Sequence, residues 1–241
     1  MSDRFHPISM EQLTAWAFTE LEEKESLFGL IRSVNALRED FGRVYVNIGE
    51  PLELELLLDD VHPGWRDSVA ENGERPAWLN EVIDRLGREI MSGVNAAAAV
   101  TPISLLAYVL LATPKQKIGA QELRRQLRFS LDLLNQFRYS DSVTVPDWEP
   151  DQIIAHGEKL DVIRRSPHPM GDVFHMEERT AVLMTYFRNN ILHLFAIPAA
   201  VACCFIQGRE LEHSELQRLV RMIYPFMRKE LCLPWNYGEI D

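Results

Sequence analysis

Apolar positions in the N-terminal part of the chain change from helical spacing to strand-like spacing. A short helix is predicted from residue 13 to about 22, and a longer one from about 26 to 39. The longer helix carries its apolar residues on one face: Leu27, Leu30, Ile31, Val34 and Leu37. Arg43–Ile48 is rich in β-branched and aromatic residues and stops at Gly49–Pro51, which predicts a strand.

Beyond residue 60 the spacing of apolar positions is helical almost to the end of the chain. It predicts helices at about 76–91, with Pro76 in the first turn, and at 94–112, 119–137, 150–158, 177–207 and 213–231. Residues 138–148 read as a loop, while Lys159–Arg164 and Asp172–Met176 predict a small hairpin. Gly208 is suited to end one helix and Pro225 to kink the last. The expected fold is a predominantly helical α/β protein.

Two apolar runs, Val94–Ala112 and Ile191–Ile206, raise the question of a membrane span. A spanning helix needs roughly 20 apolar residues. Polar residues or prolines interrupt both runs: Asn95, Thr101, Pro102 and Ser104 in the first, and His193 and Pro198 in the second. We therefore expect buried helices of a globular module, with contact to a bilayer surface as the alternative and true spanning least favoured.

Composition narrows the class of protein. The chain has 241 residues, 46% of them hydrophobic, a formal net charge of -11 and a pI near 5.2. Such acidity argues against a general nucleic-acid binder, although the helix, helix, hairpin, helix order is reminiscent of winged-helix modules. A local basic stripe is formed by Arg124, Arg125, Arg128 and Arg138. It is expected to be a solvated helix face, with binding to anionic lipid headgroups as the alternative.

The three cysteines show neither a disulfide framework nor a zinc spacing. We expect Cys203, Cys204 and Cys232 to be small buried apolar side chains. No metal site and no cofactor site is predicted.

Polar side chains cluster within the apolar segment Met184–His193. Helical spacing places Tyr186 beside Asn189 and Asn190, and both asparagines beside His193. A buried polar group without a partner costs about 1–3 kcal/mol. The stripe therefore predicts a specific hydrogen-bonded packing.

The run Tyr186–His193 also resembles a signature of the membrane-associated bacterial glycerol-3-phosphate 1-O-acyltransferase family. Further blocks resemble the family in the same order: Glu23–Leu27, Gly42–Pro51, Arg75–Leu79 and Leu219–Pro225. Together they cover most of residues 22–235. The family transfers an acyl chain from acyl-CoA or acyl carrier protein to glycerol 3-phosphate, the first step of phospholipid synthesis. The resemblance implies peripheral attachment to the cytoplasmic face of the bacterial inner membrane.

The resemblance divides the chain into two regions. Residues 1–60 look like the C-terminal part of the acyltransferase domain with the terminal strand of its sheet, and 61–241 like a helical module. Residues 1–21 are atypical, and a truncation, a pseudogene and a mispredicted start stay open as explanations. The missing acyltransferase portion is then a partner of this chain.

The family's catalytic His-x4-Asp motif and its phosphate-binding blocks lie upstream and are not matched here. His62–Asp67 and His156–Asp161 have the same spacing but follow the predicted strand, so we expect ordinary loop or helix-end residues. No catalytic residue is assigned, and the chain alone is expected to be inactive. The alternative function is a non-catalytic interaction or membrane-docking module.

The resemblance suggests a structural role for the signature residues Tyr186, Arg188, Asn189, Asn190 and His193. On this interpretation they dock the helical module on the acyltransferase sheet. The alternative is that Arg188 or His193 lines the acyl or phosphate pocket, because the planar guanidinium of arginine suits phosphate.

Overall fold

The computed structural model describes residues 45–68, 75–206, 208 and 210–235, all within the compact unit Val44–Asp241. The helices predicted at 13–22 and 26–39 lie outside these residues. The α-helices are α3 Leu54–Val61, α4 Leu79–Ala96, α5 Pro102–Leu111, α6 Ala120–Gln136, α7 Pro150–Lys159, α8 Glu178–Leu192, α9 Ala196–Cys204 and α10 His213–Leu231. The strands are β1 Lys117–Gly119, β2 Arg164–Ser166 and β3 Val173–His175. The predicted α/β class with predominant helix is confirmed.

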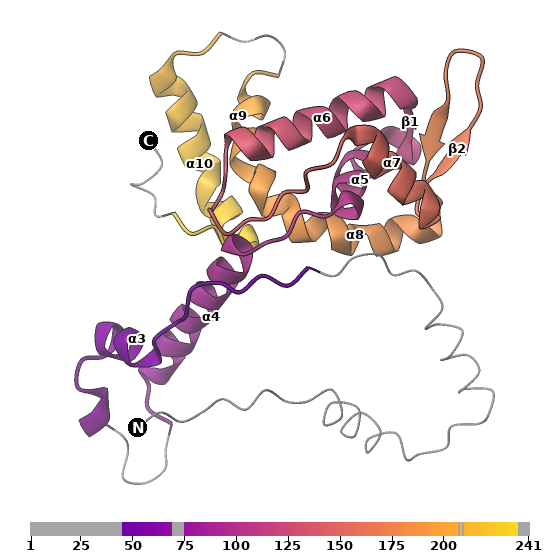
Figure 1. Ribbon diagram of the computed structural model, residues 1–241. Helices are drawn as coiled ribbons and strands as arrows, with labels where there is room; N and C mark the ends of the chain where they lie inside the picture. The colour runs from indigo at the N-terminus through magenta and orange to yellow at the C-terminus, as the bar shows by residue number, and fades with distance from the viewer. Residues whose placement is uncertain (1–44, 69–74, 207, 209, 236–241) are drawn as a thin grey trace, which may run out of the picture. The chain divides into compact units, whose positions relative to one another are not determined.

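Helix α5 forms the centre of the main core. It packs against α6, α7 and α8, which surround it in Figure 1. Leu105, Leu106 and Leu110 are completely buried. Buried residues lie on every side of this helix, as expected for a helix enclosed by others.

The single helix predicted at 94–112 is wrong, because two helices meet there. Helix α4 ends at Ala96 and α5 begins at Pro102, with Ala99 bridged to Thr144 between them. Thr101 is extended, with φ of -104° and ψ of 157°, as the residue before a proline prefers. The Thr101 hydroxyl accepts a hydrogen bond from the Ser104 amide at 3.0 Å, and the Ser104 hydroxyl accepts one from the Thr101 amide at 2.8 Å. This capping box starts a new helix where hydropathy alone shows one run.

The small sheet is antiparallel and has the order β1-β3-β2. Phe174 in β3 pairs with Ile118 in β1 and Arg165 in β2, and its side chain is buried in the main core. The predicted hairpin exists, but its first strand is Arg164–Ser166 rather than 159–164, because Asp161 turns the chain with φ of 52°. Strand β1 has no counterpart among the predicted elements. Along the chain these elements follow in the order α5, β1, α6, α7, β2, β3.

The strand predicted at Arg43–Ile48 is not formed at residues 45–48, which pair with no strand among the described residues. Burial nevertheless alternates along it: Tyr45 and Asn47 are half-buried, whereas Val46 and Ile48 are 81% and 91% exposed. The Asn47 amide donates to Ala97 O and Thr144 Oγ1, both at 3.0 Å. The segment has a strand's alternation without a ladder partner.

The helix predicted at 177–207 is composed of α8, the 3-10 turn His193–Phe195 and α9. Pro198 lacks the N–H that would bond to Leu194, and its ring crowds that carbonyl, so the tighter turn lies just before it. Gly208 has φ of 67°, the left-handed conformation predicted there. Helix α10 has the predicted bounds and contains Pro225, whose expected kink stays a prediction.

Residues Glu178–Cys204 form one helical stretch that is long and apolar enough to cross a membrane by length and composition. Only a third of its most apolar window is buried in this structure. Core helices of soluble proteins satisfy the same criterion, so the stretch is weak evidence for a span.

Candidate functional site

His193 lies at the point where the helical stretch α8–α9 meets the end of α4. Its side chain is 5% exposed, and its Nε2 lies 3.0 Å from the backbone oxygen of Asn95. A carbonyl only accepts, so Nε2 carries the proton, and in the neutral ring Nδ1 is left as an acceptor. Burial lowers the pKa of His193, while the bond to Asn95 raises it by less. The imidazole is therefore neutral at pH 7.

Asn95 ties the same junction to the C-terminal segment. Its side-chain amide donates to the backbone oxygens of Leu231, at 2.7 Å, and Cys232, at 3.3 Å. Backbone and side chain of one residue thus hold two segments that are far apart in sequence. In the sequence, Asn95 stands out only as an interruption of an apolar run.

Aromatic rings complete this junction. Tyr139 contacts His193 and Trp235 edge-on, each at 5.0 Å between ring centroids. The Tyr224 hydroxyl donates to Trp235 O at 2.8 Å. Burial raises the pKa of Tyr139, and the nearby Asn95 side chain lowers it by less. Among the described residues the Tyr139 hydroxyl has no hydrogen-bond partner.

The structure separates the polar stripe predicted from Tyr186 to His193. His193 is buried, whereas Tyr186 is 70% exposed and Asn189 and Asn190 are exposed. The end of α4 and Tyr139 cover His193, whereas Tyr186, Asn189 and Asn190 lie on a face of α8 directed away from its buried residues Met184 and Ile191. The predicted structural role of these residues stays a prediction.

Arg188 and His193 do not converge on one pocket. They are five positions apart, which on a helix separates side chains by roughly 140°. The Arg188 guanidinium donates to Asn189 Oδ1 through Nε at 3.2 Å and Nη2 at 3.0 Å. His193 lines the cavity described next, and Arg188 is not among its lining residues.

An apolar cavity of about 610 Å³ opens beside His193. It lies between the end of α6, the start of the following loop, α9 and the C-terminal segment. Its lining residues are mostly aliphatic or aromatic: Leu133, Phe137, Arg138, Tyr139, His193, Leu194, Ile197, Pro198, Val201, Ala202 and Trp235. Its volume falls within the roughly 300–1,000 Å³ that is usual for small-molecule sites.

The two His-x4-Asp pairs are placed in ordinary structural settings. The His62 ring stacks on Trp78 with centroids 5.0 Å apart, and no hydrogen bond joins it to Asp67 among the described residues. The His156 ring packs edge-on against Trp148. The Asp161 carboxylate is bonded by both Nε and Nη2 of Arg164, at 3.2 and 3.3 Å, which lowers its pKa. These contacts are those of a helix end and a turn.

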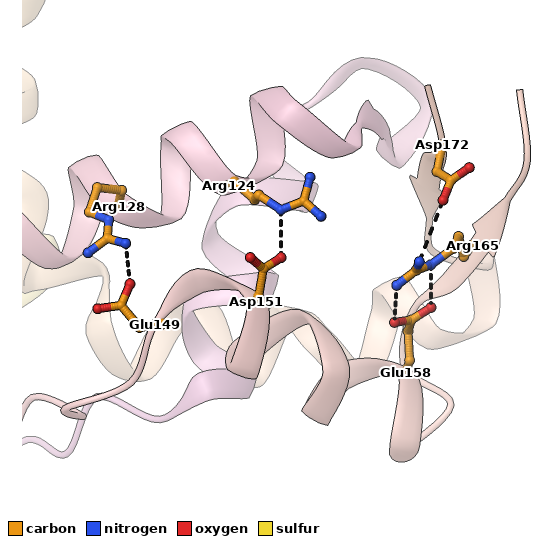
Figure 2. A network of polar contacts seen from close by, with 7 residues as sticks. All are labelled: Arg124, Arg128, Glu149, Asp151, Glu158, Arg165 and Asp172. Carbon is orange, nitrogen blue, oxygen red and sulfur yellow. Dashed lines mark hydrogen bonds and ion pairs between the residues drawn. The ribbon is translucent and has the colours of Figure 1, made fainter. Parts of the chain in front are cut away.

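Carboxylates neutralise most of the basic stripe. Figure 2 shows Arg124 paired with Asp151 at 2.5 Å and Arg128 paired with Glu149, which joins α6 to α7. Arg125 pairs with Glu122 at 2.8 Å. In the same row, Arg165 bonds Glu158 and lies 3.5 Å from Asp172. Positive charges already engaged by acids offer little to phosphate backbones.

Arg138 differs from the rest of the stripe. It is exposed, and no ion pair or hydrogen bond of its side chain occurs within the described part of the chain. It is also the cationic residue of the apolar cavity. The sequence does not distinguish Arg138 from the neighbouring arginines, because ion pairs between helices cannot be read from the spacing of residues.

The expectation of buried cysteines is wrong for Cys203, which is exposed, while Cys204 and Cys232 are half-buried. Cys203 lies on a face of α9 that no described element covers. Within residues 45–68, 75–206, 208 and 210–235, no group of three or more His, Cys, Asp or Glu side chains is arranged to hold a metal ion.

Comparison with known proteins gives a consistent result. A family profile described as the C-terminal region of glycerol-3-phosphate acyltransferase matches residues 22–241. A glycerol-3-phosphate acyltransferase of Xanthomonas campestris pv. campestris is 44% identical over 216 residues, which is 89% of this chain and 24% of that protein. Proteins of the same name from Xylella fastidiosa and Pseudomonas fluorescens are 42% and 38% identical, over 91% of this chain and 26% of each. The chain spans about a quarter of the length of the curated relatives it matches.

Proposed function

This chain belongs to the glycerol-3-phosphate acyltransferase family, and from that premise we propose that it is the scaffold that braces the acyltransferase domain. The reaction of the complete protein would transfer an acyl group from acyl-CoA or acyl carrier protein to the sn-1 hydroxyl of glycerol 3-phosphate. The observation that carries the proposal is the match of residues 22–241 to the C-terminal region of the family.

A scaffold needs a surface on which the braced domain rests, and the N-terminal part of the described chain has one. Val46 and Ile48 are 81% and 91% exposed, and an apolar stripe on α4 is about half exposed. Its members are 45–58% exposed: Ile83, Ile90, Met91 and Val94. Apolar side chains gathered in this way commonly mark a protein interface. We assign this surface to the acyltransferase domain.

The chain alone is proposed to lack catalysis. Acyl transfer to an alcohol needs a base that takes the hydroxyl proton as the oxygen attacks the thioester carbonyl. His62 stacks on a tryptophan, and Asp161 is engaged by an arginine, so neither His-x4-Asp pair is built for that step. Phosphate recognition is likewise assigned to the portion of the protein that this chain does not cover.

The decisive experiment combines this chain with the part of the Xanthomonas campestris relative that it does not cover. With glycerol 3-phosphate and palmitoyl-CoA, the purified 241-residue chain should form no lysophosphatidate, and the mixture should form it. Ile90→Asp on α4 should weaken the restored activity, whereas Asn135→Asp on the exposed face of α6 should leave it unchanged. Turnover by the chain alone would overturn the proposal.

A second candidate function is docking to the cytoplasmic face of the membrane. It is favoured by the exposed apolar side chains Val182, Leu183 and Tyr186 on α8, with the exposed Arg179 on the same face. An apolar face flanked by cations binds anionic bilayers at low salt. Vesicles containing anionic lipid should retain the chain at low salt and release it at high salt. A Leu183→Asp variant that is retained as well as the natural chain would remove this candidate.

A further inference from the structure

The apolar cavity between α6 and α9 has a composition that selects a particular kind of ligand. Its walls are almost entirely aliphatic and aromatic, with Ile197, Val201 and Trp235 among them. Burying a flexible hydrocarbon chain there removes apolar surface from water. A carbohydrate, a nucleotide or a free phosphate would not be compensated in this cavity. The walls therefore favour a hydrocarbon.

The cation of this cavity defines the other end of the ligand. Arg138 is exposed and unpaired among the described residues, whereas a carboxylate holds each of the three other arginines of the stripe, two of which Figure 2 shows. Its position in the lining together with its exposure places it at the mouth. A guanidinium binds a carboxylate through two parallel hydrogen bonds, and one positive charge matches one negative charge.

His193 adds a constraint on the interior. Its Nε2–H is used by Asn95 O, and burial lowers its pKa, so it brings no positive charge to the cavity. A second anionic group placed deep in the cavity would be neither neutralised nor solvated. The ligand should therefore carry its single charge at one end only.

We propose that this cavity binds a free long-chain fatty acid, with the hydrocarbon chain along α9 and the carboxylate on Arg138. This site is distinct from the acyl-transfer chemistry assigned to the rest of the protein, because a free acid is not an activated thioester. The proposal does not depend on the proposed function, and it concerns the 241-residue chain by itself.

The test measures binding of a fluorescent fatty acid, cis-parinarate, to the purified chain, and its displacement by palmitate below the micelle concentration. Arg138→Gln should weaken palmitate binding about tenfold or more, as expected for the loss of a charge-assisted hydrogen bond. Ala202→Trp places a large side chain at the cavity from an exposed position and should abolish binding while preserving the circular dichroism spectrum. Arg125→Gln, which removes a paired arginine of the same stripe, should bind as the natural chain does.

Further ligands identify the head group and the source of binding. Palmityl alcohol should bind about as weakly to the natural chain as palmitate binds to Arg138→Gln. Palmitoyl lysophosphatidate should bind less tightly than palmitate; tighter, Arg138-dependent binding would replace the carboxylate by a phosphate and overturn the assignment. Absence of parinarate binding, or binding unaffected by Arg138→Gln and Ala202→Trp, would overturn the site itself.

Discussion

Helices α5 and α4 are neighbours in sequence, yet they differ in how far their apolar side chains are buried. On α5 nearly every residue is buried, because α6, α7 and α8 enclose it. On α4 only Val82 is buried, and the apolar stripe from Ile83 to Val94 faces away from the described residues. The hydrophobic effect acts on the apolar side chains of both helices. The difference shows that the burial of an apolar side chain depends on the elements packed around its helix.

The largest effect is expected from truncating one side chain on each helix. Leu106→Ala in α5 should lower the free energy of unfolding by about 2–5 kcal/mol, because it leaves a cavity in a close-packed core. Ile90→Ala on α4, 46% exposed in the natural chain, should change it by less than about 0.5 kcal/mol. Urea unfolding of both variants measures the contrast. Equal losses would mean that α4 is already covered in solution.

The free energy of unfolding should depend on pH through His193, which joins the helical stretch α8–α9 to the end of α4. Its pKa is lowered in the folded state by burial, so below about pH 6.5 the unfolded chain takes up a proton that the folded chain refuses. Stability should then fall as pH falls, by up to about 1.4 kcal/mol per pH unit until the folded pKa is reached. His193→Gln should flatten this dependence, and His213→Gln, at an exposed position, should not. Urea midpoints from about pH 7.5 to 5 provide the measurement.

A smaller effect is expected where the chain passes from α4 to α5. Thr101→Ala removes the hydroxyl that accepts from the Ser104 amide and should cost about 1 kcal/mol of stability. Thr101→Ser keeps the hydroxyl and should retain most of that stability. Thermal unfolding monitored by circular dichroism distinguishes the variants. If alanine is tolerated as well as serine, Pro102 alone is sufficient to start α5.

The smallest effects are expected from the surface ion pairs of the two regions. Double-mutant cycles on Arg124 with Asp151, and on Arg85 with Glu89 in α4, should give coupling energies of about 0.2–1 kcal/mol. Both pairs are largely exposed, so about 1 M salt should remove most of the coupling. A larger coupling energy for Arg124 with Asp151 would mean that the ion pairs in Figure 2 stabilise the packing of α6 on α7.

Local signals in the sequence predict the elements that are stabilised locally. Helices α6, α7 and α10 lie within a few residues of their predicted bounds, because a proline, a glycine or a change of periodicity marks their ends. Strand β1 escapes prediction because Lys117–Gly119 carries one apolar residue, and its existence depends on pairing with β3. The split of 94–112 escapes it because the apolar run continues across Pro102.

The site is harder to predict than the fold. His193 stands out in the sequence as a polar residue inside an apolar helix, but its partner Asn95 is 98 positions away. Arg138 in the lining of the cavity differs from the three neighbouring arginines because, among the described residues, those three pair with carboxylates and Arg138 does not. No periodicity carries that information, because most of those carboxylates belong to other elements.

Asn95 connects the end of α4 to two other segments of the chain. The helix is about 27 Å long at 1.5 Å per residue, with its apolar stripe along the shaft and Asn95 near the tip. A small tilt of α4 would move the Asn95 carbonyl, which is bonded to the His193 imidazole, and the Asn95 side-chain amide, which is bonded to Leu231 O. Docking of a partner on the apolar stripe of α4 would thereby shift His193 at the wall of the apolar cavity.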